Sequence, residues 1–321
     1  MKSSAAQGNK GGPAPLARLI EGRRPVLLDG AMGTELERRG VPTGLPLWSA
    51  HALLTSPGTV RRIHDEYIDA GADIITTNTF RTTRRTFLRA GLPDRSAELT
   101  ALAVALARES TGASPGKRVL IAGSMAPLED CYKPGLVPGD EALREEHSRH
   151  ARRLADEGVD FLVLETMGTV REAARAAEAA KGTGLEFVVS FLCRGEGSLY
   201  GGEPLEEAVR LIMRLAPAAI SINCVSPGSM GNLLANLQSA LRRIPGGENV
   251  PIGLYANVGT PGDEDGTFLR DVGPAAYAEY AGSWVHAGAS LVGGCCGTTP
   301  EYIRATAGVL AAERHSSGRD G

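Results

Sequence analysis

Eight short apolar runs rich in Val, Ile and Leu recur along the chain, separated by longer segments with Ala, Leu, Arg and Glu at helical spacing. The runs are continuously apolar, which predicts strands buried on both faces, as in a parallel sheet covered by helices. They occupy residues 26–30, 73–78, 119–124, 161–166, 187–192, 218–224, 251–257 and 290–296.

Helical patterns lie between these runs. Ser56-Pro57 and Thr299-Pro300 each place a capping residue before a proline at the first helical position. A strand followed by a helix, eight times over, indicates an α/β fold of the (β/α)8 TIM-barrel type in a single domain. A doubly wound sheet is the main competitor, but no G-x-G-x-x-G follows the first strand. The predicted helices cover residues 57–70, 95–110, 141–157, 169–181, 204–215, 229–243, 274–287 and 300–312.

The two ends of the chain are small, polar and rich in Gly, Pro or Ser. Residues 1–15 and 313–321 are therefore predicted to be disordered tails around a barrel spanning 16–312. A formal net charge of -3 with 22% charged residues argues against nucleic-acid binding. Runs of about 18 apolar residues and a secretory signal are both missing, so we expect no membrane span and a cytoplasmic location.

The segment from Met125 to Asp140 is longer than most connections in such barrels and rich in Pro and Gly. It is interpreted either as a lid over the mouth of the barrel or as a connecting loop without a function of its own.

The cysteines are the residues most informative about chemistry. An odd set of five, at positions 131, 193, 224, 295 and 296, argues against a disulfide framework and for metal binding or catalysis. The carboxyl ends of barrel strands build the active site. Cys224 ends the sixth predicted strand and Cys295 and Cys296 end the eighth, so we expect these three sulfurs to meet.

Three thiolates and one open position are typical of a catalytic zinc site. None of the six histidines ends a predicted strand. Zinc held by sulfur activates water poorly, but it binds a substrate thiol as a thiolate at neutral pH. The pattern therefore predicts alkylation of a thiol. Gly293 and Gly294 are expected to leave room for backbone to approach the ion.

From about Leu19 to Leu310 the sequence resembles the zinc-dependent homocysteine S-methyltransferase family. The resemblance implies a (β/α)8 barrel that holds Zn²⁺ on Cys224, Cys295 and Cys296 and methylates L-homocysteine to methionine. It is carried by LLDGAMGTELERRG (27–40), LWSAHALL (47–54), AGADIITTNTF (70–80), GVDFLVLET (158–166), SINC (221–224), ANVG (256–259) and GGCCGTTP (293–300).

Asp29 and Glu165 end the first and fourth predicted strands and match family positions that contact homocysteine. The resemblance implies that they bind its ammonium group, with Glu165 beside the cysteines in the catalytic set. The alternative is that both carboxylates cap loops. Gly30 opens a turn, residues 30–33, whose N–H groups are expected to bind the substrate carboxylate.

Further polar residues end predicted strands. Asn78, Ser124 and Asn257 are expected to orient substrate or the zinc ligands, or instead to satisfy loop backbone. Cys131 and Cys193 reach the same face but match no zinc ligand of the family, so they are interpreted as bystanders.

The methyl donor is less constrained, because members of the family use betaine, S-methylmethionine, dimethylsulfoniopropionate or a corrinoid. Arg81 and Thr166 stand where betaine users carry tyrosines, which disfavours betaine. LWSA around Trp48 resembles S-methylmethionine users, and an indole face suits a sulfonium, although core packing is an equal alternative.

Two other functions stay open. TNTF (77–80) resembles the homocysteine module of the cobalamin enzyme, so a separate corrinoid protein is an alternative donor and partner. A non-catalytic barrel that senses zinc or redox state is the other alternative. The oligomeric state is not predicted.

Overall fold

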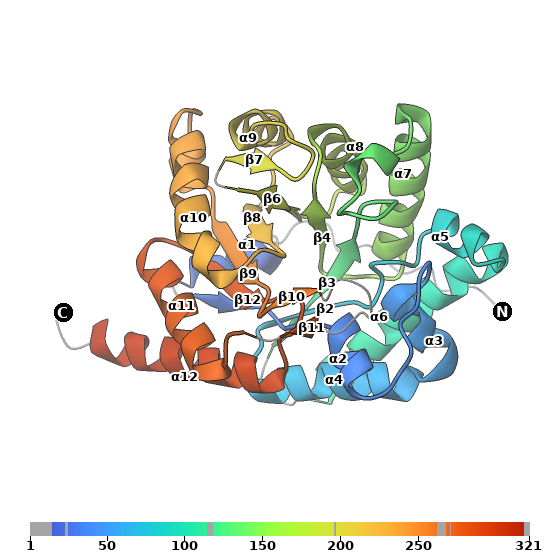
Figure 1. Ribbon diagram of the computed structural model, residues 1–321, viewed down its shortest axis with the longest axis horizontal. Coiled ribbons are helices and arrows are strands. Elements are labelled where there is room, and N and C mark those ends of the chain that lie inside the picture. The colour runs from blue at the N-terminus through green and yellow to red at the C-terminus, as the bar shows by residue number, and fades with distance from the viewer. Residues whose placement is uncertain are drawn as a thin grey trace, which may run out of the picture.

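The eight predicted strands form one parallel sheet that closes on itself (Figure 1). The computed structural model describes residues 15–22, 25–113, 118–195, 197–261, 268–269 and 271–317. The strand order is β1-β12-β9-β8-β5-β4-β3-β2, and a bridge from Leu28 to Ile74 joins β1 to β2. The strands are β1 (Val26–Leu27), β2 (Ile74–Thr76), β3 (Leu120–Met125), β4 (Phe161–Met167), β5 (Phe187–Phe191), β8 (Ala219–Asn223), β9 (Ile252–Ala256) and β12 (Leu291–Gly294).

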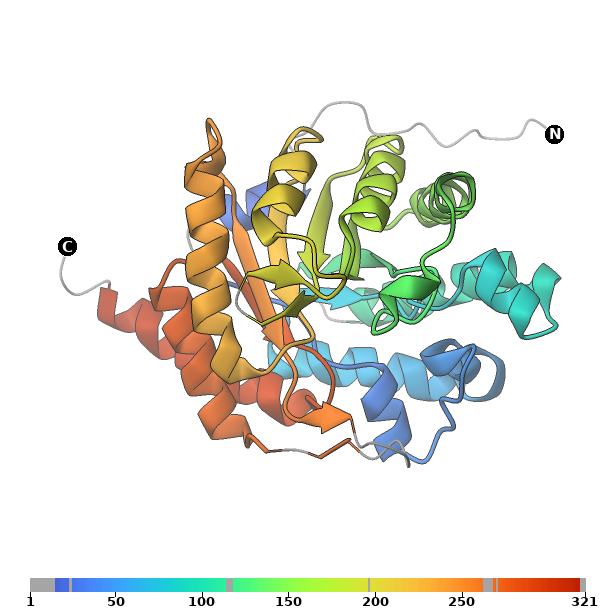
Figure 2. The ribbon, with the colours of Figure 1, turned by 45° about the horizontal axis from the view of Figure 1, so that its top comes forward.

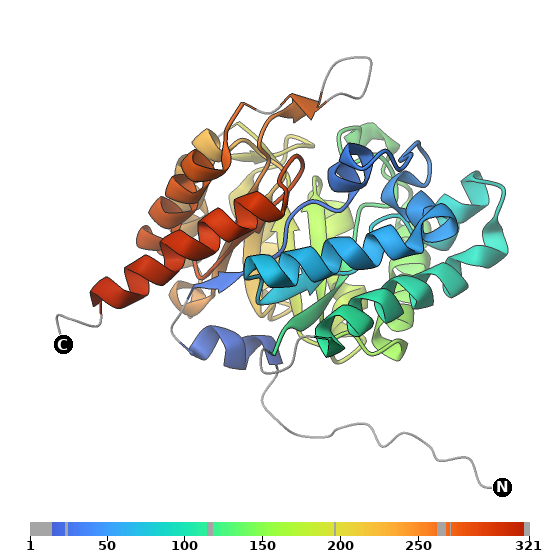
Figure 3. The same ribbon diagram turned by 90° about the horizontal axis from the view of Figure 1, so that it is seen from below.

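Helices surround this sheet on the outside, as Figures 2 and 3 show. The predicted (β/α)8 architecture in a single domain is therefore confirmed. None of the described helices combines the length and apolarity needed to cross a membrane. The predicted helices are α4 (Pro57–Ala70), α6 (Ser96–Gly112), α7 (Asp140–Asp156), α8 (Val170–Lys181), α9 (Leu205–Met213), α10 (Pro227–Arg242), α11 (Pro274–His286) and α12 (Pro300–Ser317).

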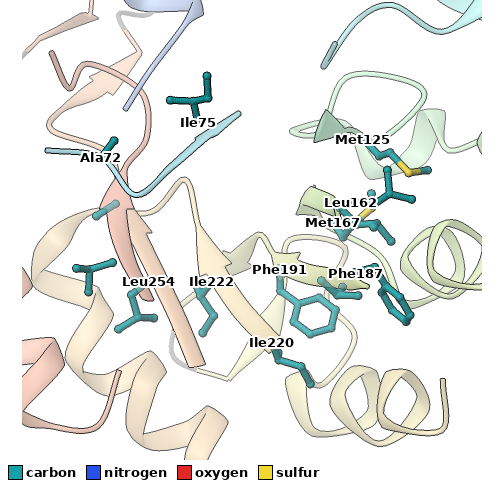
Figure 4. Close-up of a cluster of buried hydrophobic side chains, with 14 of the residues drawn as sticks. Ala72, Ile75, Met125, Leu162, Met167, Phe187, Phe191, Ile220, Ile222 and Leu254 are labelled. Atoms are coloured by element: carbon teal, nitrogen blue, oxygen red, sulfur yellow. The ribbon is translucent and has the colours of Figure 1, made fainter. Parts of the chain in front are cut away.

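The main hydrophobic core fills the layer between strands and helices. Outward-facing side chains such as Leu162, Phe191, Ile222 and Leu254 are buried there against the helices (Figure 4). Burial of such side chains stabilises the fold by about 1.5–3 kcal/mol each. This layer makes the barrel a rigid support for the strand ends.

A second apolar cluster lies inside the barrel and is closed by α1 (Pro15–Glu21), a helix that the sequence did not predict. Leu16 of α1 is fully buried against Val26, Ile74 and other inward-facing side chains. Glu186 accepts the backbone N–H groups of Leu16 and Ala17 at 2.8 and 3.0 Å, which caps the start of α1.

The predicted ends of the barrel were partly wrong. α12 continues to Ser317, so the tail predicted over 313–321 is helical for its first five residues, and α1 begins at Pro15 inside the other predicted tail. The rest of both tails lies outside the described residues. The helices at Pro57 and Pro300 begin as predicted, but the side chains of Ser56 and Thr299 accept no capping hydrogen bond.

The segments that connect the main strands and helices contain short elements that the sequence did not predict. Among the described residues they are α2 (Gly33–Arg38), α3 (His51–Thr55), α5 (Arg84–Arg89), the 3-10 helices at Trp48–Ala50, Pro93–Arg95, Pro134–Leu136 and Gly247–Asn249, and the antiparallel pairs of β6 (Cys193–Arg194) with β7 (Ser198–Leu199) and of β10 (Thr260–Pro261) with β11 (Phe268–Leu269).

Candidate functional site

Three cysteines meet at the carboxyl end of the barrel. The Sγ atom of Cys224 lies 3.2 Å from that of Cys295 and 3.8 Å from that of Cys296, and all three sulfurs lie within 4.8 Å of one another. Tetrahedral zinc with Zn–S bonds of about 2.3 Å separates its sulfurs by about 3.8 Å. All five cysteines are free thiols, and the spacing of the three clustered sulfurs fits a metal ion.

Cys295 and Cys296 follow β12, which ends with Gly293 and Gly294. Both glycines pack closely against other segments of the protein. A Cβ atom at Gly293 would lie 2.7 Å from Leu28 Cβ, and one at Gly294 would lie 2.3 Å from Thr298 Oγ1. These glycines allow close contact with β1 and with the turn after the cysteines. That they also leave room for backbone to approach an ion stays a prediction.

Hydrogen bonds hold the backbone of the cysteine cluster. Asn257 Oδ1 accepts the backbone N–H of Cys296 at 3.1 Å, and Thr298 Oγ1 donates to the carbonyl of Cys295 at 2.7 Å. Cys224 has a φ of 61°, a left-handed conformation that costs about 1–3 kcal/mol outside glycine. Such strain at a strand end is typical of functional sites.

The three sulfurs share protons unequally. Hydrogen bonds from Cys295 and then Cys296 hold the pKa of Cys224 well below its usual range. The pKa values of Cys295 and Cys296 are raised well above their usual range, mainly because each thiol is hydrogen-bonded to Cys224. One thiolate is therefore already favoured in the cluster, and a bound cation would replace the protons of the other two.

A cavity of about 280 Å³ opens above the cysteines. Its size suits an amino acid together with a small second substrate. Of the residues predicted to bind substrate, all but Asn257 line it: Asp29, Gly30, Trp48, Asn78, Ser124 and Glu165.

Two carboxyl groups, the buried Asp29 and the half-buried Glu165, lie on the wall of this cavity. Asp29 accepts the backbone N–H and the hydroxyl of Thr76 at 2.7 and 2.9 Å, and Glu165 accepts the hydroxyl of Ser124 at 2.6 Å. Burial raises the pKa of Asp29 to about 8 and that of Glu165 to about 7. Neither has a cationic partner among these contacts, so a ligand ammonium group would stabilise their charged forms.

Trp48 and Asn78 have structural contacts as well as cavity-facing atoms. The indole of half-buried Trp48 packs on Gly33, where an added Cβ would lie 2.5 Å from Nε1. Asn78 Nδ2 donates to the carbonyl of Ser49 at 3.0 Å, while its Oδ1 is buried without a protein partner. Ala31 N–H donates to Thr298 Oγ1 at 3.1 Å, so the turn at Gly30 offers a ligand fewer N–H groups than expected.

Comparison with known proteins shows which family has this sequence and fold. The model of the homocysteine S-methyltransferase family matches residues 26–310. The chain belongs to this family. It is 33% identical to the homocysteine S-methyltransferase of Escherichia coli K12 (91% of this chain, 97% of the relative) and 30% identical to a selenocysteine methyltransferase of Astragalus bisulcatus (91% and 94%). The metallated crystal structure of the E. coli homocysteine methyltransferase MmuM matches with a TM-score of 0.78 and 31% identity, covering 92% of this chain and 99% of that one.

In this member of the homocysteine S-methyltransferase family, some of the remaining residues considered from the sequence line the cavity and others do not. Arg81 and Thr166 line the cavity, and Thr166 has a φ of 61°. Cys131 also lines it but lies outside the cysteine cluster. Cys193 is buried in β6 and does not line the cavity.

Sequence reasoning missed two residues that contact the cysteines. Asn223 Oδ1 accepts the backbone N–H of Thr166 at 3.0 Å and the hydroxyl of Ser190 at 2.8 Å, and its Nδ2 lies 3.8 Å from Cys295 Sγ. The available signal was the amide of Asn223, directly before Cys224 in a mainly apolar run. Tyr132, from the long segment interpreted as a lid or a connecting loop, places its hydroxyl 3.5 Å from Cys224 Sγ.

Proposed function

We propose that this protein transfers a methyl group from a small sulfonium compound, S-methylmethionine being favoured, to the thiol of L-homocysteine, with zinc held by Cys224, Cys295 and Cys296. The observation that carries the proposal is the cluster of three sulfurs within 4.8 Å of one another beneath a cavity lined by the carboxyl groups of Asp29 and Glu165. Membership of the homocysteine S-methyltransferase family supports methyl transfer to homocysteine.

The choice of metal rests on the donor set. Three thiolates without a histidine or carboxylate in the cluster are soft ligands, which suit zinc better than magnesium, calcium or manganese. When bound there, zinc would supply a cationic site that lowers the pKa of a thiol joining the three cysteines.

Asp29 and Glu165 are proposed to bind the homocysteine ammonium group. Asp29 is buried and Glu165 half-buried on the cavity wall, and charge on either is costly until a cation arrives. Ser124 holds the Glu165 carboxyl in place through its 2.6 Å hydrogen bond. The amino acid would thereby be oriented with its side-chain sulfur toward the cysteine cluster.

A cationic donor is favoured by the charges around the cavity. Asp29, Asp130 and Glu165 line it, and Arg81 is the cation among its described lining residues. Trp48 contributes an indole face, which attracts a sulfonium by a cation–π interaction worth about 0.5–2 kcal/mol.

In the proposed reaction, the homocysteine thiol first releases its proton to solvent. Its sulfur then attacks the methyl carbon of the sulfonium in line, and a new S–C bond forms as the donor S–C bond breaks. The electron pair of the broken bond remains on the donor sulfur, which leaves as a neutral thioether. With S-methylmethionine both products are methionine. The protein's part is to hold the attacking homocysteine sulfur about 3–3.5 Å from the methyl carbon, on the side opposite the donor sulfur.

The test is methionine formation from homocysteine by zinc-loaded protein, with S-methylmethionine, dimethylsulfoniopropionate, betaine and methylcobalamin supplied separately. Cys296→Ala removes one proposed ligand, and Cys193→Ala removes a buried thiol outside the cluster as a matched control. We expect turnover with a sulfonium donor that Cys296→Ala abolishes and Cys193→Ala retains.

Turnover with methylcobalamin alone would instead identify a corrinoid as the donor. No turnover with any donor, in protein that binds zinc stoichiometrically, would contradict methyl transfer from free donors.

A further inference from the structure

The loop between β3 and α7, residues 126–139, is anchored firmly at its beginning. The N–H of Leu128 donates to Glu172 Oε1 at 2.8 Å, and the carbonyl of Glu129 accepts Arg81 Nη1 at 2.9 Å. The buried Glu129 carboxylate also pairs with Arg85 at 2.6 Å. These contacts fix the position of the backbone from which residues 130–132 continue.

The loop then turns into the mouth of the barrel. Tyr132 N–H donates to Asp130 Oδ1 at 3.0 Å, which shapes a tight turn. Cys131 and Tyr132 consequently line the cavity. The Tyr132 hydroxyl lies 3.5 Å from Cys224 Sγ, within hydrogen-bond range of sulfur.

The ring of Tyr132 is held from the side by the β6–β7 hairpin. Its centroid lies 5.4 Å from that of Tyr200 at an interplanar angle of 77°, an edge-to-face contact. Gly168 lies where the two loops meet, because an added Cβ there would be 3.3 Å from the carbonyl oxygen of Cys131 and 3.4 Å from Tyr200 Cβ. The phenol is therefore positioned by Tyr200, and the backbone just before it packs close to Gly168.

We propose that Tyr132 is a positioning residue that holds Cys224 in its metal-binding arrangement by donating a hydrogen bond to the sulfur, so that this loop forms part of the metal centre. The inference rests on the proposed zinc site. Cys224 needs such support because its backbone is in the left-handed region, with a φ of 61°. Hydrogen bonds to metal ligands fix their orientation and moderate their charge.

Tyr132→Phe tests this, since it removes the hydroxyl and keeps the ring on Tyr200. We expect zinc affinity, measured by competition with a chelator, to fall about 3- to 10-fold. The sulfur-to-metal charge-transfer band of the cobalt(II)-loaded protein should shift. Tyr280→Phe is the matched control, because Tyr280 is 39% exposed and Tyr132 37%, and Tyr280 lies outside the cavity lining.

Tyr200→Ala gives a second, independent variant, because it removes the ring's support and leaves the hydroxyl. We expect a smaller loss of zinc affinity in the same direction. Zinc affinity and a cobalt spectrum unchanged in Tyr132→Phe would overturn the inference. Wild-type protein that binds zinc through Cys224 but forms no methionine would refute the proposed function alone, since the metal readouts still decide the role of Tyr132.

Discussion

The side chain of Asn257, at the end of β9, accepts the backbone N–H of Cys296, at the end of β12, at 3.1 Å. This bond fixes the position of one proposed zinc ligand from the neighbouring strand. Asn257→Ala leaves the N–H without its acceptor, so we expect weaker zinc binding and a loss of about 1–3 kcal/mol in the free energy of unfolding. Chelator competition and urea unfolding measure the two effects.

Asn257→Asp is the matched control because it keeps an acceptor oxygen at the same place. Zinc binding should be retained better by Asn257→Asp than by Asn257→Ala. Equal losses in the two variants would show that the acceptor is not what matters.

Gly294 precedes the two cysteines at a point where the chain has no room for a methyl group. In Gly294→Ala the new Cβ would lie 2.3 Å from Thr298 Oγ1 and 2.8 Å from Thr298 Cβ, so the turn must shift. We expect a loss of about 1–3 kcal/mol in stability together with reduced zinc stoichiometry. Gly308→Ala in α12 is the control, because no atom lies within 4 Å of its added Cβ and alanine favours a helix. Similar behaviour of both variants would contradict this packing argument.

The buried carboxyl groups predict how the stability of the metal-free, ligand-free protein depends on pH. Burial raises the pKa of Asp29 to about 8 and that of Glu165 to about 7, against about 4 in the unfolded chain. Between these values the folded protein binds protons that the unfolded chain has lost. This stabilisation is therefore complete below about pH 4 and is lost as the pH rises through 7 to 8.

Urea unfolding across this range should show stability falling toward pH 8, and Asp29→Asn should make the fall shallower. The exposed Asp94 supplies the control variant, Asp94→Asn, whose profile should follow the wild type. A wild-type profile that rises toward pH 8 would refute the assignment.

Trp48 separates donor binding from homocysteine binding. Trp48→Leu keeps an apolar side chain but removes the indole face, so the KM for a sulfonium donor should rise about 3- to 30-fold while the KM for homocysteine changes little. Trp48→Phe, which retains an aromatic face, should lose less. Steady-state kinetics that show equal increases in both KM values would assign Trp48 to packing on Gly33 instead.

The sequence predicted the barrel and the cysteine cluster because one rule connects them. The carboxyl ends of all parallel strands in a barrel lie at the same face. Because Cys224, Cys295 and Cys296 were predicted to end strands, their sulfurs were predicted to lie close together, as they do. The same rule placed Asp29 and Glu165 on the cavity wall.

Features set by tertiary contacts could not be predicted in this way. Tyr132 lies next to Cys224 in a loop that is held by hydrogen bonds of Leu128 and Glu129 with residues more than 40 positions away in the sequence. Such long-range contacts leave no pattern in the sequence. The role of Asn223 could not be predicted because the sequence does not show which face of β8 lies toward Thr166. The end of α12 was predicted to be a disordered tail because it is polar. The helix continues there, and it includes the good helix formers Ala311, Ala312 and Glu313.

The measurement that tests the central claim most directly is calorimetric binding of L-homocysteine to zinc-loaded and zinc-stripped protein. Homoserine, which carries a hydroxyl in place of the thiol, and Cys224→Ala are the controls. The account predicts homocysteine binding that requires zinc, is lost in Cys224→Ala and is not reproduced by homoserine. Equal homocysteine affinity with and without zinc would contradict it, because the cysteine cluster would then have no part in binding the substrate thiol.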